Sequence, residues 1–150
     1  MPVLIPYLLR RFPRFRSFRI RVHLDGRVTV SQLPRLTHKD YLRHKEAARA
    51  LVIERIGYFN HVYGFPFNNI FIKNQKTCWG SCSKNKNLNF NYKIAFLPPR
   101  LADYIMVHEL CHLQEMNHSK RFWMLVVKTI PDHTIRRRAL KTASPSRSRP

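Results

Sequence analysis

A short segment of the chain carries the residue types that hold a metal ion and activate water on it. The segment His108–His112 reads HELCH, and a further histidine follows at His118. At 3.6 residues per turn, His112 lies about 40° around a helix from His108 and one turn along, so both imidazoles can reach one ion. Glu109 lies about 60° from His112 on the same side, where its carboxylate can hold a water molecule at the metal. The spacing predicts a hydrolytic metal site.

A catalytic zinc ion takes three protein ligands and leaves a fourth position for water. Two carboxylates and two histidines follow His112 in the chain. We expect His118 to be the third ligand, with Glu115 and His133 as the alternatives. In a continuous helix His118 would lie about 9 Å beyond His112, so the helix must end before it and turn back. Asn117 tolerates the left-handed backbone that such a turn uses.

The predicted chemistry is peptide hydrolysis by a zinc-activated water. Zinc lowers the pKa of its water toward about 7. Glu109 then accepts the proton of the water and passes it to the leaving amine. His133, Tyr92 and Tyr104 are the candidates for stabilising the oxyanion. We expect the substrate to lie extended along the strand predicted over residues 88–94, adding its backbone to that edge.

Alternating apolar residues and turn signals predict the elements that position this segment. A strand over residues 18–24 leads through the turn Asp25-Gly26 into a return strand with Val28 and Val30. Thr37 and Asp40 form a capping-box-like start to a helix that runs to about Asn60. Short strands are predicted over residues 70–72 and 88–94, with a polar, turn-rich segment between them at 77–87. The second strand should be one-sided, because its apolar residues alternate with Asn89, Asn91 and Lys93.

The remaining elements are helices. Pro98-Pro99 opens the helix that carries the metal motif, since prolines are tolerated in a first turn. A second helix is predicted from Ser119 to a point before Pro131, and a last one from Pro131 to about Lys141. The spacing of Phe122 and Trp123 in the second helix favours core packing. Cys111 is interpreted as a small buried residue, and Cys78 and Cys82 as cysteines without a structural zinc, because no second pair exists.

These elements predict one α+β domain, a small antiparallel or mixed sheet packed on the active-site helix. We divide the chain into a basic extension (1–16), the domain itself (17–143) and a basic tail (144–150) that we expect to be disordered. Three cysteines, an odd number, fit a reducing compartment. No apolar run approaches the roughly 20 residues of a membrane span. We therefore expect a cytoplasmic protein that does not cross a membrane.

The net charge is the unusual bulk property of the 150-residue chain. It has 28 Lys plus Arg against 8 Asp plus Glu, a formal charge of +20. A charge of this size attracts polyanions, so nucleic acid is a predicted partner beside the protein or peptide substrate. No nucleic-acid-binding motif accompanies the charge, and a solvated basic surface explains it equally well. The alternative function is a basic nucleic-acid-binding protein with a structural or vestigial zinc site.

Several segments from Gln75 onward, among them Trp79-Gly80-Ser81-Cys82, Val107–Leu113 and Met116–Ser119, resemble those of the YgjP-like metallopeptidase family, relatives of the SprT-like proteases within the zincin group. The resemblance implies a minimal zincin-like fold, zinc on His108, His112 and His118, and Glu109 as the catalytic base. His133 stands where members often have tyrosine, which leaves the identity of the oxyanion stabiliser open. Cys78 stands where a basic residue is common. The matching segments are Gln75-Lys76-Thr77, Trp79-Gly80-Ser81-Cys82, Pro98-Pro99, Asp103-Tyr104, Val107–Leu113, Met116–Ser119 and Arg121-Phe122-Trp123.

Overall fold

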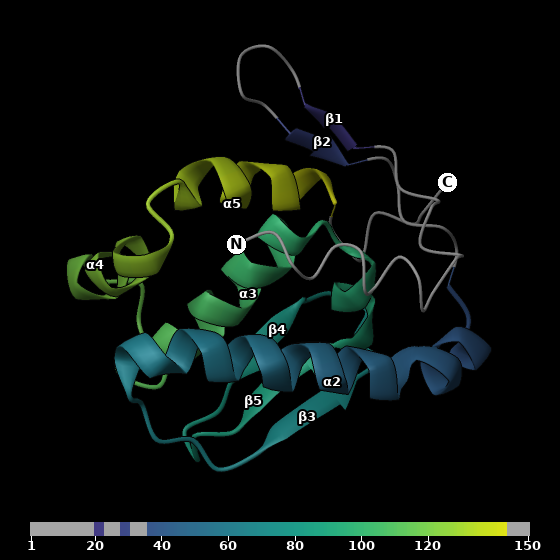
Figure 1. Cartoon of the computed structure of the whole chain (residues 1–150), viewed down its shortest axis with the longest axis horizontal. Helices are drawn as coiled ribbons and strands as arrows, with labels where there is room; N and C mark the ends of the chain where they lie inside the picture. The colour runs from purple at the N-terminus through teal and green to yellow at the C-terminus, as the bar shows by residue number, and fades with distance from the viewer. Residues whose placement is uncertain (1–19, 23–27, 31–35, 144–150) are drawn as a thin grey trace.

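The computed structural model describes residues 20–22, 28–30 and 36–143. The predicted extension (1–16), the turn at Asp25-Gly26 and the tail (144–150) lie outside the described residues. The described part is an α+β arrangement, which confirms the predicted fold class (Figure 1). Its elements are β1 (Ile20–Val22), β2 (Val28–Val30), α2 (His38–Tyr63), β3 (Ile70–Lys73), β4 (Gly80–Cys82), β5 (Leu88–Asn91), the 3-10 helix η2 (Tyr92–Phe96), α3 (Pro99–Cys111), α4 (Lys120–Thr129) and α5 (His133–Thr142).

The strands form two separate sheets. β1 and β2 pair antiparallel, as predicted, and β2 lies against α5. The register places Val22 opposite Val28, whereas a two-residue turn at Asp25-Gly26 would place it opposite Thr29, so the predicted register is wrong by one residue. The other sheet has the order β3-β5-β4, with β3 parallel and β4 antiparallel to β5. β5 is therefore the central strand, hydrogen-bonded on both sides. The prediction that a substrate adds to the edge of this strand is wrong, because β5 has no free edge.

The predicted extent of this strand is also wrong. Alternation suggested a one-sided strand to Ile94, but β5 ends at Asn91 and both of its faces are buried. The asparagines that suggested a solvent-facing side are buried and hydrogen-bonded. The Asn91 amide donates to the carbonyls of Gln75 and Cys78 at 2.7 and 3.0 Å, and its Oδ1 accepts from the Lys93 N–H. This capping turns the chain into η2 in place of a longer strand.

The long helix α2 begins as predicted and ends later than predicted. The Thr37 side chain accepts from the Asp40 N–H, and the Asp40 carboxylate accepts from the Thr37 N–H, a complete capping box. The helix continues past Asn60 to Tyr63 and stops at Gly64, whose φ of 65° gives a left-handed C-cap. One face of α2 is buried in the core, through Ala48, Val52, Ile56 and Phe59.

The helix α3 is the central element of the fold. It packs against α2, α4, α5 and β4 (Figure 1). Nine of its thirteen residues are buried, so it has no broad solvent face. Arg55 on α2 makes two hydrogen bonds to Asp103 on α3, at 2.7 and 2.8 Å, which fix the two helices against each other. A functional group on α3 is consequently held in the interior of the molecule.

Candidate metal centre

The three predicted ligands lie at the end of α3 and in the turn after it. His108 is in the last turn of the helix, and His112 is its C-cap residue. The chain then turns back, and α4 begins after Ser119, whose side chain accepts from the Phe122 N–H. His118 lies in the connection between α3 and α4. The prediction that the helix ends before His118 is confirmed, and it ends earlier than expected.

The geometry predicted for Asn117 is wrong. Among the described non-glycine residues, a positive φ occurs at Lys86 and not at Asn117. Asn117 instead uses its side chain, whose Oδ1 accepts from the Ser119 N–H at 3.1 Å. A side-chain-to-backbone turn of this kind reverses the chain without the left-handed conformation.

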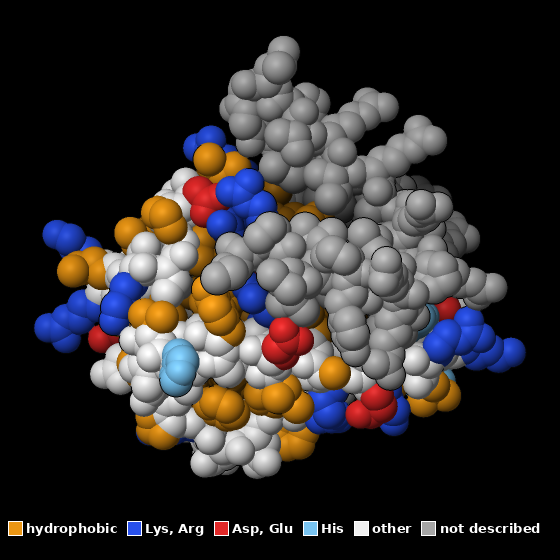
Figure 2. Space-filling view, viewed as in Figure 1, with side chains coloured by type: hydrophobic (Ala, Val, Ile, Leu, Met, Phe, Trp, Pro, Cys, Tyr) orange, Lys and Arg blue, Asp and Glu red, His pale blue; other side chains and the backbone are white. Residues whose placement is uncertain are grey.

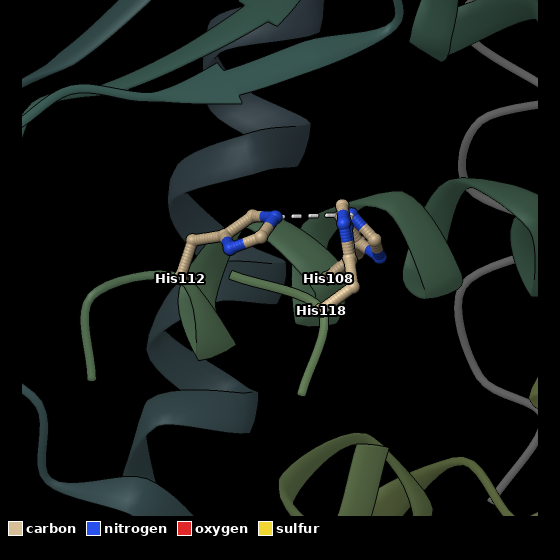
Figure 3. Close-up of side chains that lie close together, drawn as sticks. All are labelled: His108, His112 and His118. Carbon is tan, nitrogen blue, oxygen red and sulfur yellow. Dashed lines mark hydrogen bonds between the residues drawn. The ribbon is translucent and has the colours of Figure 1, made fainter. Parts of the chain in front are cut away.

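The three imidazoles converge on one point (Figure 3). The Nε2 atom of His108 lies 3.2 Å from Nε2 of His112 and 3.0 Å from Nε2 of His118. One ligand atom from each residue lies within 4.8 Å of the other two. Tetrahedral ligands held at about 2.0–2.1 Å from zinc would be about 3.3 Å apart, close to these separations. The two alternative ligands, Glu115 and His133, are not part of this cluster.

Hydrogen bonding and burial prepare these histidines as ligands. The Nδ1–H of His112 donates to the Glu115 carbonyl at 2.9 Å, which leaves the lone pair of Nε2 directed at the cluster. Burial, together with the neighbouring imidazoles, lowers the pKa of His108 to about 3, and burial also lowers the pKa of His112. Neutral imidazoles are the form that binds a metal. Because His118 is exposed, the cluster is open on one side, so the residues present fit a three-histidine site with a free fourth position.

The carboxylate of Glu109 is buried beside the cluster. Its residue is 7% exposed, and burial raises its pKa to about 8. The side chain lies against Gly80, the first residue of β4. A Cβ atom at Gly80 would come within 2.8 Å of Glu109 Cγ and 3.0 Å of Oε1. A glycine at this position therefore allows the Glu109 carboxylate to occupy its place. In the sequence, Gly80 is marked only as part of the family resemblance.

A small pocket opens beside this carboxylate. Its volume is about 160 Å³, and α3, α5 and the start of β4 contribute its walls. His108 and Glu109 both reach the pocket, so a molecule in it would meet the cluster and the carboxylate together. The lining residues are Trp79, Gly80, Tyr104, Ile105, His108, Glu109 and Leu140.

Two aromatic residues of α4 support the histidines. The ring centroid of Phe122 lies 4.9, 4.5 and 4.8 Å from those of His108, His112 and His118. Phe122 is fully buried, which confirms the predicted core packing. Trp123 is only partly buried and stacks on His118 at 5.7 Å. The core-packing prediction did not foresee that Trp123 contacts a candidate ligand.

The structure separates the three candidate oxyanion stabilisers. Tyr92 is fully buried and packs against Tyr41 and Phe96, so it offers no surface to a substrate. Tyr104 lines the pocket, with its ring centroid 5.8 Å from that of His108. His133 begins α5 and stacks on Trp123 at 5.1 Å, so it is linked to the cluster through that ring.

Other predictions concern the cysteines and the surface. Cys111 is fully buried, as predicted, and Cys78 and Cys82 are free thiols outside any described cluster of metal-binding groups. No described helix combines the length and apolar character that crossing a membrane requires. On the face drawn in Figure 2, lysine and arginine side chains lie in several separate groups. A nucleic-acid partner and a cytoplasmic location stay predictions from the composition.

Comparisons with known proteins identify the family of the chain and structures of similar fold. The family model described as the YgjP-like metallopeptidase domain matches residues 38–143. No curated protein matches the chain in sequence. The fold is similar to the metallopeptidase zymogen abylysin of Pyrococcus abyssi (TM-score 0.54, 24% identity over 60% of this chain and 92% of that one). It is also similar to the metallopeptidase zymogen jannalysin of Methanocaldococcus jannaschii (TM-score 0.51, 22% identity, 60% and 94%).

Proposed function

The chain belongs to the YgjP-like metallopeptidase family, and from that membership we propose that it cleaves peptide bonds of protein substrates with one zinc ion held by His108, His112 and His118. The observation that carries this proposal is the convergence of three imidazoles beside a buried carboxylate. When bound, zinc supplies Lewis acidity to the attacking water and to the scissile carbonyl.

Glu109 is the proposed general base. Its carboxylate accepts a proton from the attacking water and delivers it to the leaving amine nitrogen. Burial raises the pKa of this carboxyl to about 8 in the metal-free protein, and a cation on the three histidines would favour its charged, proton-accepting form. Gly80 fixes the position from which the carboxylate acts. The pocket next to it gives the scissile group a place within reach of both His108 and Glu109.

Tyr104 is our first candidate for stabilising the oxyanion, and His133 is the second. The Tyr104 side chain borders the same pocket as Glu109, and burial raises its pKa, so the phenol keeps its proton and can donate it in a hydrogen bond. Among the described residues, the contact that links His133 to the cluster is its stacking on Trp123. A Tyr104→Phe variant should lose more kcat than a His133→Gln variant, and the reverse order would exchange the two roles.

An extended substrate would bind along β4. Among the described residues β4 pairs with β5 alone, so its other backbone edge is free. Gly80 at the start of β4 touches Glu109, which places this edge beside the catalytic carboxylate. A peptide adding to the edge as a strand would bring its carbonyl groups toward the pocket.

The decisive experiment compares two substitutions of the same chemistry. Zinc-loaded wild type, Glu109→Gln and Glu115→Gln are incubated with an unstructured protein, and cleavage and zinc content are measured. We expect Glu109→Gln to keep its zinc and lose cleavage by about 10²–10⁴-fold, because a general base contributes on this order. Glu115→Gln should cleave normally, since the Glu115 group that contacts His112 is its backbone carbonyl.

The same experiment separates the peptidase from the alternative function. A nucleic-acid-binding protein with a structural zinc site would keep its metal and cleave nothing, with or without Glu109. Wild-type hydrolysis that survives Glu109→Gln would instead reject the base assignment while leaving the metal site intact.

A further inference from the structure

The helix α5 carries an arginine that faces the metal centre. Arg137 lies one turn before Leu140, which lines the pocket beside Glu109. The Arg137 guanidinium carbon lies 5.3 Å from the ring centroid of Trp123. Trp123 in turn stacks on His118, one of the three converging histidines. The guanidinium is thus placed at the border of the site by a cation–π contact.

Arg137 has no carboxylate partner among the described residues, unlike the residue before it, Arg136. Asp132 accepts from both Arg136, at 2.8 Å, and Arg100, at 3.0 Å, and these two arginines are thereby held in ion pairs. No described carboxylate lies within ion-pair distance of Arg137, which is exposed. Its charge therefore remains available to a molecule that enters from solvent.

The Arg137 charge lies close to the metal centre, because its guanidinium contacts the Trp123 ring and that ring stacks on His118. A guanidinium near a site for a divalent cation is electrostatically unfavourable unless an anion binds between or beside them.

We propose that Arg137 binds a carboxylate of the peptide substrate, so that the enzyme prefers a substrate with a negative charge close to the scissile bond. Guanidinium groups bind carboxylates through two parallel hydrogen bonds, which would fix the orientation of the substrate as well as attract it. The carboxylate can be an Asp or Glu side chain or the C-terminal carboxylate of the substrate. This inference rests on the proposed peptidase function.

Peptides that differ in a single group test the preference for a negative charge. They also show whether the carboxylate is that of a side chain or that of the C-terminus. One series carries Glu, Gln or Lys at successive positions around a single cleavable bond, and a second compares a free C-terminus with its amide. We expect wild type to favour the negatively charged peptide of one series, which is either the Glu peptide or the peptide with the free C-terminus. In Arg137→Gln this advantage should fall by about tenfold in kcat/KM, mainly through KM, with neutral peptides cleaved within about twofold of wild type.

Arg138→Gln is the matched control, because it removes the same charge from the next residue of the same helix. Arg138 is exposed and contacts none of the described residues of the site. An equal loss of selectivity in both variants would overturn the inference in favour of a general charge effect. An equal loss in Arg137→Gln on acidic and neutral peptides would also overturn it.

A binding measurement keeps the inference separate from the proposed function. Titration calorimetry of zinc-loaded Glu109→Gln with the acidic and neutral peptides reports recognition without turnover. The arginine site is supported if Glu109→Gln binds the acidic peptide preferentially and Glu109→Gln/Arg137→Gln does not. This holds even if wild type cleaves nothing, because the absence of cleavage refutes the peptidase function alone. Equal binding of both peptides refutes the arginine site even if wild type is an active peptidase.

Discussion

Replacing Gly80 by alanine should displace the carboxylate of Glu109, the proposed general base, without touching any of the three proposed metal ligands. The new Cβ would lie 2.8 Å from Glu109 Cγ, a distance that real Cβ atoms essentially never show, and an ordinary contact of 3.4 Å requires the two atoms to move apart by 0.6 Å (3.4 − 2.8). The contacted atom lies in the middle of the side chain, so the carboxylate has to move with it. A misplacement on the order of 1 Å costs about 10²-fold in rate, and we expect roughly 10- to 100-fold lower kcat/KM in Gly80→Ala.

The assay is cleavage of a peptide substrate by zinc-loaded protein, with the zinc content measured in parallel. Gly57→Ala is the matched control, because a Cβ at Gly57 has no neighbour within 4 Å and the residue lies inside α2. It should keep full activity and gain up to about 1 kcal/mol of stability from the better helix propensity of alanine. In a Glu109→Gln background, Gly80→Ala should add little further loss, since the two changes act on one group. Normal activity of Gly80→Ala would refute the claim that this glycine positions the base.

Three further predictions concern stability. Zinc at about 100 times its Kd should stabilise the wild type by about 2.7 kcal/mol in thermal unfolding. A chelator or the substitution His118→Ala should remove this gain. The control His61→Ala, at an exposed histidine, should keep it. Asp103→Asn should lower the free energy of unfolding by about 2 kcal/mol in denaturant titration, because the side chains of Arg55 and Asp103 are only 19% and 17% exposed. Glu46→Gln, in an exposed pair with Arg49, should change the free energy of unfolding by less than about 0.5 kcal/mol. In the metal-free protein the Glu109 pKa is about 8 when folded and 4.5 as its ordinary value, so the folded state binds more protons and its stability falls as pH rises between these values. Glu109→Gln lacks this loss, and its stability advantage over wild type should grow from pH 4.5 to 8; a constant difference would contradict the buried-carboxylate argument.

The local part of the site could be predicted from the sequence, because helical periodicity alone brings His108 and His112 to one side. His118 was selected from the few possible ligands that follow His112, on the condition that the helix ends before it. The structure places its imidazole beside those of His108 and His112. The geometry of the turn was not predictable in the same way. Asn117 can reverse a chain through its backbone or through its side chain, and the sequence contains no signal that separates the two.

The sheet was harder to predict because its polar residues are buried. Asn89 and Asn91 suggest a solvent-facing side, yet both amides donate to backbone carbonyls and β5 is enclosed. β4 was missed for a related reason, since Gly80–Cys82 lies in a polar, turn-rich segment. Without β4 in the prediction, the substrate was assigned to the wrong strand. Hydrogen bonds between distant segments decide such cases, and single-chain patterns do not record them.

Among three consecutive arginines, the sequence cannot say which one faces the site. Successive residues of a helix are about 100° apart, so only one of the three can point at Trp123 while another pairs with Asp132. The structure makes this choice through the packing of α5 on α3. The same packing buries Glu109 and so raises the cost of its charge. A cation on the three histidines lowers that cost, which means that metal binding and the basicity of Glu109 are coupled by burial. On an exposed helix with the same HELCH spacing, water would screen the cation from the glutamate, and this coupling would be weaker.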